Sequence, residues 1–359
     1  MHYSQRQSDH SYLPSLPRKG RVRPERTLPR GPDCGRTLAY LRGILHAILH
    51  SFVINKCTTG RLARSRGGNN GADGTRLEQN TMAQQQFSLA HLTALGCSPP
   101  ALVRIAAAAG YDFVGLRTIP LRLPDEPRYE VHTNPDLYRQ TKSALAETGV
   151  GLLDIELARI VDGQDPRHFL PALEAGANLG ARHILTSIWT PNRSLATDAF
   201  GELCDLAAPF GLTVNLEFVA WAACSTLAAA IDVLRTAGRP NAGITIDTFH
   251  FHHSGDVVED LDALPREWFS YAHVSDDARQ EPDTVEACKR RGRAARLYPG
   301  EGDIDIAGIL EHLPGRTVCA IELPHDQRLK ELGPLEFAKQ CLRRTVCYLE
   351  ESSRELARP

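Results

Sequence analysis

Four polar side chains stand at the carboxyl ends of short apolar runs in the second half of the chain: Glu217, Asp247, His273 and Glu322. Such runs are candidate strands, and an unpaired carboxylate is costly to bury beside them. Three carboxylates close together would repel one another, and a bound dication would remove that repulsion. A neutral imidazole completes a mixed nitrogen and oxygen shell. This donor set suits one divalent ion of Mn²⁺, Mg²⁺, Co²⁺ or Zn²⁺.

These side chains can meet only if the strands before them end at the same side of a sheet. From Phe87 onward, short apolar runs alternate with stretches of helical spacing. The predicted strands are Phe87–Leu92, Phe113–Arg117, Gly151–Ile155, His183–Ile188, Thr213–Phe218, Ala242–Asp247, Phe269–Val274 and Thr317–Leu323. The predicted helices are Pro99–Ala109, Pro135–Thr148, Pro166–Leu179, Thr197–Phe210, Thr226–Ala237, Val257–Leu264, Ile306–Leu313 and Pro334–Leu349. Eight strand–helix units over about 265 residues match a (β/α)₈ TIM barrel, whose functional groups gather at the carboxyl ends of the strands.

The predicted helix boundaries agree with this α/β reading. Asn134 and Asp165 each precede a proline, as a cap residue precedes the first helical turn, and Gly149 ends the second helix. An open doubly wound sheet would show the same alternation, but no glycine-rich phosphate turn follows the first predicted strand. The sequence therefore favours the closed barrel.

Other side chains fall at the same predicted end of the barrel and are candidates for substrate binding. Glu156 lies just past the third strand and Arg117 ends the second; they could contact substrate hydroxyls or pair with each other. Trp189 could stack on a sugar face or pack under a loop, and His325 follows the last strand. The basic stretch Lys289–Arg296 is expected in a long loop, where it either closes over an anionic substrate or lies in solvent.

The four predicted ligands resemble the metal site of the sugar phosphate isomerase/epimerase superfamily, whose members share a xylose isomerase-like TIM barrel. The motif Asp247-x-x-His250 is its most diagnostic part, and the turn Tyr298–Asp305 is a second similar segment. The resemblance covers Phe87 to Leu349.

The resemblance also implies roles for individual residues. Glu217 and Glu322 would act both as metal ligands and as the acid and base. Arg279 is similar to an arginine that ketose 3-epimerases place after the metal-binding histidine. His250 and Arg279 would donate hydrogen bonds to a developing oxyanion. His250 could instead order the Asp247 carboxylate.

This chemistry predicts a divalent-metal-dependent isomerase or epimerase of a sugar or sugar phosphate. Proton transfer next to a carbonyl passes through a metal-stabilised enediolate, and the site of reprotonation decides between epimerisation and aldose–ketose isomerisation. The alternative is a metal-dependent dehydratase of the inosose or 3-dehydroshikimate type, in which proton abstraction is followed by loss of a β-hydroxyl as water. The four ligands cannot separate the two reactions.

A DNA-repair enzyme of the endonuclease IV type, which has a similar Asp-x-x-His motif, is disfavoured. The second and third strands end with Arg117 and Glu156 where that family has histidines, and no Asp-x-His pair follows His273. The predicted barrel is also acidic, which disfavours steering toward phosphate backbones. We therefore expect no nucleic-acid partner.

Residues 1–84 differ in composition from the rest of the chain. Before Met82, about 14 Lys and Arg stand against about 5 Asp and Glu, with many Pro and Gly. We expect a largely disordered extension there and the barrel over residues 85–352. A helical stripe from Leu41 to Phe52 would suit a targeting or interaction helix, or translation begins at Met82.

The remaining features of composition predict a cytoplasmic enzyme of small molecules. The nine cysteines show no CxxC pair, which is typical of a reducing compartment. No apolar run reaches the roughly 20 residues of a membrane span. We expect a sugar-like substrate and no membrane partner; homo-oligomers are common in the resembling family.

Overall fold

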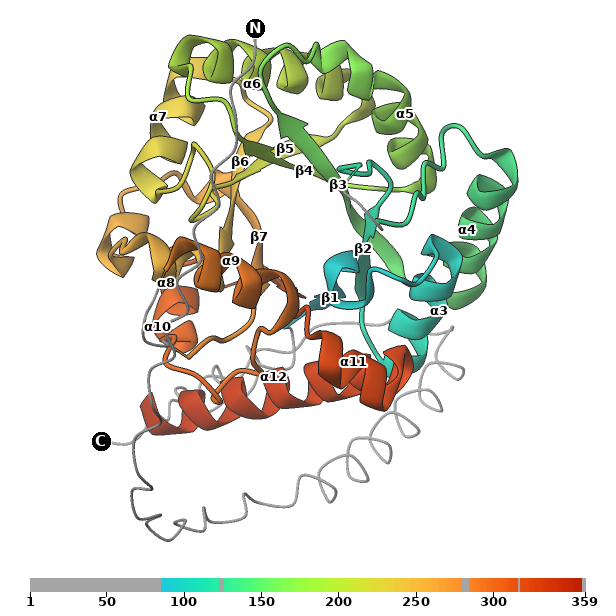
Figure 1. The fold of residues 1–359 in the computed structure, drawn as a ribbon, viewed down its shortest axis with the longest axis vertical. Helices are drawn as coiled ribbons and strands as arrows, with labels where there is room; N and C mark the ends of the chain where they lie inside the picture. The colour runs from blue at the N-terminus through green and yellow to red at the C-terminus, as the bar shows by residue number, and fades with distance from the viewer. Residues whose placement is uncertain (1–84, 123–125, 279–283, 316, 357–359) are drawn as a thin grey trace, which may run out of the picture. The chain divides into compact units, whose positions relative to one another are not determined.

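The computed structural model describes residues 85–122, 126–278, 284–315 and 317–356. Eight parallel strands form a closed barrel in which each strand pairs with its neighbours along the chain. The first strand, β1 (Phe87–Leu89), also pairs with the last, β8 (Val318–Ile321), which closes the barrel. Helices surround the strands (Figure 1). The predicted TIM barrel is confirmed.

The strands between β1 and β8 lie close to their predicted positions. They are β2 (Phe113–Arg117), β3 (Gly151–Ile160), β4 (His183–Ile188), β5 (Thr213–Glu217), β6 (Ala242–Asp247) and β7 (Phe269–Val274). The exception is β3, which continues to Ile160 and not only to Ile155. Glu156 therefore lies within a strand and not just after one.

The helices follow in the expected alternation. The α-helices are α3 (Pro99–Ala109), α4 (Pro135–Thr148), α5 (Leu170–Leu179), α6 (Arg193–Ala207), α7 (Leu227–Ala237), α8 (Thr248–Ser254), α9 (Val285–Ala294), α10 (Ile306–Glu311), α11 (Asp326–Leu332) and α12 (Pro334–Leu356). Short 3₁₀ turns are η1 (His91–Ala94), η2 (Pro166–Phe169), η3 (Ala208–Phe210), η4 (Val258–Leu261) and η5 (Arg266–Trp268).

Local sequence explains several of these boundaries. The Asn134 side chain accepts a hydrogen bond from Leu137 N at 3.0 Å and so caps the start of α4. Asp165 accepts one from Arg167 N at 2.9 Å at the start of η2. Gly149 ends α4 with a φ of 73°, a left-handed conformation that glycine adopts without strain.

Two predictions around the last strands were wrong, and two short helices there were missed. The basic stretch Lys289–Arg296 is not a loop for most of its length, because α9 runs to Ala294. The helix predicted over Val257–Leu264 is reduced to the short turn η4. Helices α8 and α11 were not predicted, since seven residues are too few to show a helical period.

Two apolar clusters hold the barrel together. Successive strand residues point to opposite faces, so Leu185 of β4 joins the cluster inside the barrel while its neighbour Ile184 packs toward the helices. Leu157 of β3 also belongs to the inner cluster. The residue two positions later, Arg159, therefore shares the inner face of β3 near its carboxyl end.

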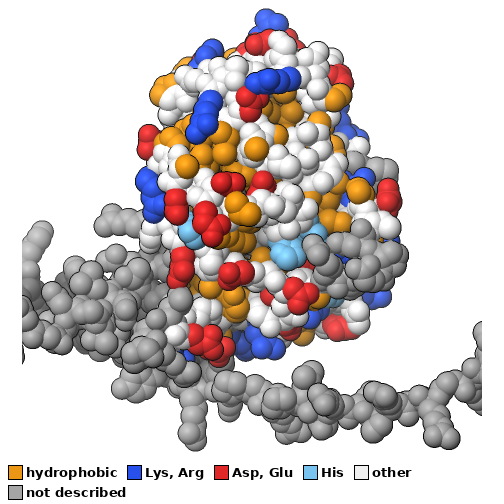
Figure 2. Space-filling model, turned by 90° about the vertical axis from the view of Figure 1, so that its left-hand side faces the viewer, with side chains coloured by type: hydrophobic (Ala, Val, Ile, Leu, Met, Phe, Trp, Pro, Cys, Tyr) orange, Lys and Arg blue, Asp and Glu red, His pale blue; other side chains and the backbone are white. Residues whose placement is uncertain are grey.

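No helix in the described part of the chain is long and apolar enough to cross a membrane. The face drawn in Figure 2 carries acidic and basic side chains side by side, with hydrophobic ones between them. The predicted extension over residues 1–84, including the Leu41–Phe52 stripe and Met82, lies outside the described residues.

Candidate metal centre

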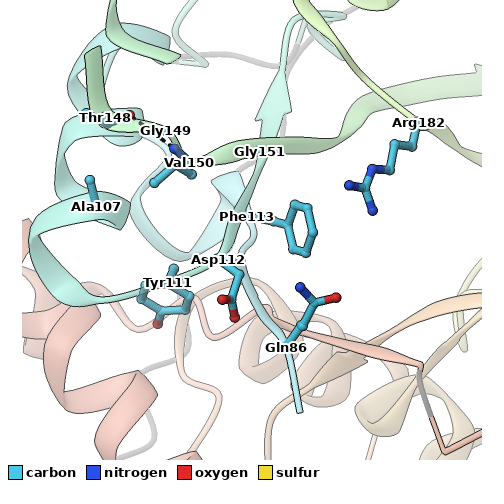
Figure 3. A pocket seen from close by; sticks show the side chains of 10 residues that line it. All are labelled: Gln86, Ala107, Tyr111, Asp112, Phe113, Thr148, Gly149, Val150, Gly151 and Arg182. Atoms are coloured by element: carbon cyan, nitrogen blue, oxygen red, sulfur yellow. Dashed lines mark hydrogen bonds between the residues drawn. The ribbon is translucent and has the colours of Figure 1, made fainter. Parts of the chain in front are cut away.

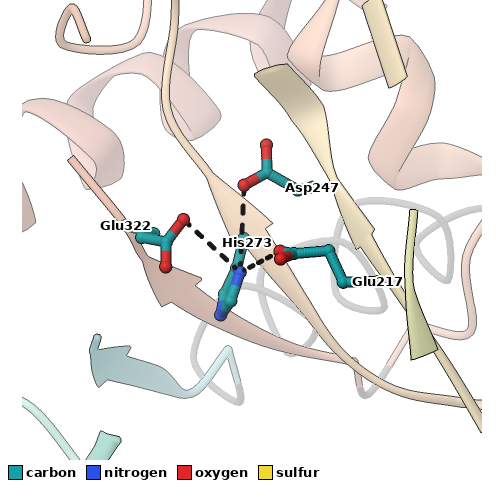
Figure 4. Close-up of side chains that lie close together, drawn as sticks. All are labelled: Glu217, Asp247, His273 and Glu322. Carbon is teal, nitrogen blue, oxygen red and sulfur yellow. Dashed lines mark hydrogen bonds and ion pairs between the residues drawn. The ribbon is translucent and has the colours of Figure 1, made fainter. Parts of the chain in front are cut away.

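The four predicted ligands converge at the carboxyl ends of the last four strands (Figure 4). Glu217 and Asp247 end β5 and β6, His273 lies in β7, and Glu322 directly follows β8. Asp247 and His273 are paired in the register of β6 and β7. All four are buried, and one potential ligand atom from each lies within 4.8 Å of the others.

Hydrogen bonds fix the orientation of these side chains. His273 Nδ1 donates to Glu217 Oε1 at 2.8 Å and lies 3.8 Å from both Asp247 Oδ2 and Glu322 Oε2. Asp247 Oδ1 accepts hydrogen bonds from two backbone N–H groups at the start of α8, at 2.8 and 3.1 Å. Capping of α8 therefore leaves Asp247 Oδ2 to the cluster.

Protons and one arginine balance the carboxylates of the cluster. Burial disfavours charge on His273, but the carboxylates around it, Glu322 first among them, raise its pKa to about 10. Burial raises the pKa of Glu322 to about 8, although His273 and Arg296 oppose this. A dication would replace the imidazole proton as counter-charge, and three carboxylates with one imidazole suit such an ion. The residues present fit a divalent metal.

Arg296 reaches the cluster from the segment after α9 and was missed among the predicted site residues. Its Nη1 donates to Asp247 Oδ2 at 2.7 Å, and its Nη2 lies 3.1 Å from Glu322 Oε2. The side chain is 1% exposed. Its Nε donates to Gly292 O at 2.8 Å, and its guanidinium lies 4.9 Å from the ring centroid of Phe249. This buried arginine therefore holds the carboxylates of two predicted ligands in place.

The segment around Arg296 is fixed by the loop after β7. Arg296 lies between two isolated antiparallel bridges, one of Ala295 with His325 and the other of Leu297 with Asp276. The Asp276 carboxylate also accepts hydrogen bonds from three backbone N–H groups of the following turn, at 2.9, 2.9 and 3.1 Å. That turn is Tyr298–Asp305, which already stands out in the sequence. Arg296 lies just before it, and this position is the sequence signal that could have identified Arg296.

A single glycine allows the turn to approach the loop after β7. A Cβ atom on Gly302 would overlap with the backbone oxygen of Asp277. The Asp277 carboxylate accepts two contacts from Arg291 Nε, at 3.1 and 2.9 Å, and lies 2.8 Å from His253 Nε2. Asp277 therefore ties α8 and α9 to the loop that carries the site.

His250 is buried beside the cluster. Burial lowers its pKa to about 4. Its Nδ1 accepts a hydrogen bond from Ala220 N at 3.5 Å, and its ring packs edge-on against Trp221 at 4.8 Å. The backbone N–H of His250, and not its ring, orders the Asp247 carboxylate. A role of the ring in oxyanion binding stays a prediction, and Arg279 lies outside the described residues.

Arg117 and Glu156 pair with each other, which was one of the two alternatives. They are register partners on β2 and β3, and Arg117 Nε and Nη2 donate to Glu156 Oε2 at 2.9 and 2.7 Å. Glu156 Oε1 accepts a hydrogen bond from His91 N at 3.2 Å. His91 Nδ1 accepts from Arg117 N at 2.7 Å, so its Nε2 carries the proton and donates to Cys97 O at 2.9 Å.

The two remaining substrate-binding candidates already have protein partners. The guanidinium of Arg159 lies 4.2 Å from the ring centroid of Trp189, so it covers one face of the predicted stacking platform. Trp189 Nε1 donates to Ser187 Oγ at 2.9 Å. His325 Nδ1 accepts from Arg328 N at 3.4 Å and caps α11. Contact of Trp189 or His325 with a substrate stays a prediction.

A polar layer lies inside the barrel below the metal centre. Asn215, Thr245 and Tyr271 each precede a predicted ligand by two positions and so share its strand face. The amide of Asn215 and Oδ2 of Asp154 are buried without a hydrogen-bond partner in the described part of the chain. Burial, and then the charge of Glu156, raises the pKa of Asp154 well above its usual range. Burial therefore favours the protonated, neutral form of the Asp154 carboxyl group.

A pocket of about 470 Å³ lies at the opposite end of the barrel, where β2 and β3 begin (Figure 3). The charged side chains that line this pocket make contacts within the fold. Arg182 lies 4.6 Å from the ring centroid of Phe113, and Asp112 accepts a hydrogen bond from Phe87 N at 2.9 Å. None of the predicted site residues lines this pocket, so it does not mark the candidate centre. Its lining residues are Gln86, Ala107, Tyr111, Asp112, Phe113, Thr148, Gly149, Val150, Gly151 and Arg182.

Comparison with known proteins agrees with this geometry. The sequence profile of the xylose isomerase-like TIM barrel family matches residues 103–345. The chain belongs to this family. An inosose isomerase of Bacillus velezensis is 24% identical over 253 residues, which are 64% of this chain and 86% of that protein. A 3-dehydroshikimate dehydratase of Pseudomonas aeruginosa is 28% identical over 166 residues, which are 45% of this chain and 25% of that protein.

A solved structure supports the xylose isomerase-like fold independently. The IOLI protein with a bound zinc atom superposes with a TM-score of 0.62 at 21% identity. The superposition covers 74% of this chain and 99% of that chain. At this identity the likeness shows the shared barrel, while the case for a metal comes from the residues of the cluster.

Proposed function

We propose that this xylose isomerase-like protein is a divalent-metal-dependent isomerase or epimerase of a sugar or sugar phosphate. The observation that carries the proposal is the convergence of Glu217, Asp247, His273 and Glu322 within 4.8 Å at the barrel mouth. The likeness to an inosose isomerase and to a zinc-containing barrel supports it. The seven described cysteines form no disulfide, which supports the proposed cytoplasmic location.

The four predicted ligands would have different roles in this reaction. Asp247 and His273 would hold the ion together with the two glutamates, and the ion, when bound, supplies Lewis-acid polarisation of the substrate carbonyl. Glu217 uses Oε1 to accept from His273, and Glu322 uses Oε2 to contact Arg296. The carboxylates of Glu217 and Glu322 would remove a proton beside the carbonyl and return one.

Two further residues would support the proton transfers. Arg296 keeps the carboxylates of Asp247 and Glu322 oriented, because it contacts both. His250, neutral and anchored through Nδ1 to the backbone, would donate from Nε2 to the developing oxyanion. Return of the proton to the opposite face gives an epimer, and return to the adjacent carbon gives an isomer.

The second candidate is a dehydratase on the same cluster. The likeness to a 3-dehydroshikimate dehydratase favours it, and both reactions start with the same proton abstraction. The difference lies in the next step, in which a β-hydroxyl leaves as water. Which of the two reactions the protein catalyses therefore depends on the substrate.

Proton NMR in D₂O on the metal-loaded full-length protein tests the proposal, with a panel of ketoses, aldoses, inososes and 3-dehydroshikimate. We expect solvent deuterium beside the carbonyl together with a new sugar. Glu322→Gln should abolish the exchange, whereas Glu331→Gln, on the exposed side of α11, should not. A vinylic product would establish the dehydratase instead. Absence of exchange with every compound, while the metal binds, would refute the sugar reaction.

A further inference from the structure

Trp221 lies beside His250, in the loop between β5 and α7, and its indole is half-buried. The ring centroids of Trp221 and His250 are 4.8 Å apart, and the two rings meet at an angle of 76°. The residue before Trp221, Ala220, donates its backbone N–H to His250 Nδ1 at 3.5 Å. Two consecutive residues of one loop therefore contact the same imidazole, one through its backbone and the other through its side chain.

Hydrogen bonds within the loop hold its backbone. Val219 N donates to Cys224 O at 3.0 Å, and Ala222 N donates to Val219 O at 2.7 Å. Cys224 N donates to Ile188 O, at the end of β4, at 3.2 Å. Since the backbone around Trp221 is held in this way, the position of the indole depends on the side chains and helices that pack against it.

Gly292 of α9 makes room for the edge of the indole. A Cβ atom on Gly292 would lie only 2.6 Å from Trp221 Cη2 and 2.9 Å from Phe249 Cε1, which is closer than van der Waals contact. The rings of Trp221 and Phe249 pack edge-on, with their centroids 6.1 Å apart. Glycine is less favourable than alanine inside a helix, so this close packing supplies a reason for a glycine at position 292.

The backbone of Gly292 is itself tied to the metal centre. Its carbonyl oxygen accepts a hydrogen bond from Arg296 Nε at 2.8 Å. Arg296 is buried and contacts the carboxylates of both Asp247 and Glu322. The distance between α9 and the indole is therefore held from the side of the helix as well as from the side of the loop.

We propose that Trp221 and Gly292 are positioning residues for His250. The contact of the indole with Gly292 holds the imidazole in the orientation in which its Nε2 faces a substrate oxygen. This inference rests on the proposed function, in which His250 donates to the developing oxyanion. Trp221 and Gly292 act through His250, and because such a donor has to be in place before the charge develops, a turned ring lowers the rate while the metal stays bound.

NMR of the Zn²⁺-loaded full-length protein, with ¹³C at Cε1 of histidine, tests the contact without any substrate. The chain has 14 histidines, and His250→Asn identifies the signal of His250. We expect Gly292→Ala to shift this signal, because the added methyl group displaces the indole. Gly176→Ala is the matched control: a Cβ atom there would lie 2.6 Å from Ile155 Cδ1, equally tight but between α5 and the outside of β3. It should leave the His250 signal in place.

Trp221→Phe separates the indole from other effects of the methyl group. A phenyl ring does not reach the positions of Cη2 and Cζ3, so Gly292→Ala should shift the His250 signal less in a Trp221→Phe background. An equal shift in both backgrounds would mean that the methyl group acts through Phe249 and would overturn the role of Trp221. No shift in Gly292→Ala, or an equal shift in Gly176→Ala, would overturn the role of Gly292.

Deuterium exchange of the compound identified in D₂O measures the consequence for the reaction. Gly292→Ala and Trp221→Leu should each lower the exchange rate at saturation about tenfold, with KM and Zn²⁺ affinity nearly unchanged. A raised KM at an unchanged rate, or a loss of Zn²⁺ affinity, would overturn the positioning role. Absence of exchange with every compound refutes the proposed function instead, and the His250 signal then still reports whether α9 holds the ring.

Discussion

Arg296 Nη1 donates a hydrogen bond to Asp247 Oδ2 at 2.7 Å across 49 positions of the sequence. The same guanidinium lies 3.1 Å from Glu322 Oε2. One buried cation thus links the carboxylates that follow β6 and β8. Arg296 and a metal ion would neutralise the same carboxylates, and this shared role can be measured.

Replacing Arg296 by methionine should destabilise the metal-free protein by about 3 to 5 kcal/mol, because buried carboxylates lose their counter-charge. The metal-loaded protein should lose less, since the ion supplies that charge. Urea unfolding of both forms measures the two losses. Arg354→Met, at an exposed ion pair of α12, should change neither form appreciably. Equal losses for Arg296→Met with and without metal would place the ion elsewhere.

The pair of Arg117 and Glu156 should behave as a buried ion pair. Glu156→Gln should cost about 3 to 5 kcal/mol of unfolding free energy, because Arg117 keeps its charge inside the protein. Glu147→Gln, in the exposed pair with Arg104, should leave stability nearly unchanged. Arg117→Met combined with Glu156→Gln should recover part of the loss. Strictly additive effects in this double-mutant cycle would show that the two side chains do not interact.

Asp154→Asn should stabilise the metal-free protein at neutral pH. Burial raises the pKa of Asp154 above the unfolded value of 3.8, so the folded state binds the proton that the unfolded state releases. Stability from this group is therefore present at low pH and is lost as pH rises above 3.8. The neutral amide of asparagine escapes that loss. Denaturant curves between about pH 4 and pH 8 should diverge, and parallel curves would mean that Asp154 is ionised in the fold.

Acidification should destabilise the protein through His91. Its pKa is lowered from 6.5 to about 4, mainly by burial, so the unfolded state takes up a proton first as pH falls. Stability is present above pH 6.5 and is lost toward pH 4, by on the order of 3 kcal/mol from this group. His183, with its pKa also lowered to about 4, adds to the same slope. Unfolding free energies measured across this window should fall less steeply in His91→Gln. An unchanged slope would assign the loss to other groups.

The barrel and the grouping of the four predicted ligands could be predicted because both depend on local signals. Apolar runs, cap residues and terminal glycines mark where strands and helices end, as Asn134 and Gly149 do for α4. In a parallel barrel all carboxyl ends of strands meet at one face. Side chains at those ends, such as Asp247 and His273, are then close together without any knowledge of packing.

The environment of the arginines could not be predicted in this way. An arginine in a basic stretch usually lies in solvent. Arg296 is buried instead, because it is paired with Asp247 and Glu322. These partners are 49 and 26 positions away in the sequence, so local spacing does not reveal them. The pairing of Arg117 with Glu156 depends on the register of β2 with β3, which spacing alone leaves open. Nδ1 of the His250 ring accepts a hydrogen bond from Ala220 N, which again depends on a segment distant in the sequence.

The barrel is divided between two tasks. All predicted ligands come from β5 to β8, whereas β2, β3 and β4 carry the arginines and the indole around the mouth. Under the proposed function, mutations in the first half of the chain would therefore change which compound is recognised while the four predicted metal ligands persist. Such a protein would acquire a new specificity in small steps, because no step would have to rebuild the proposed metal site.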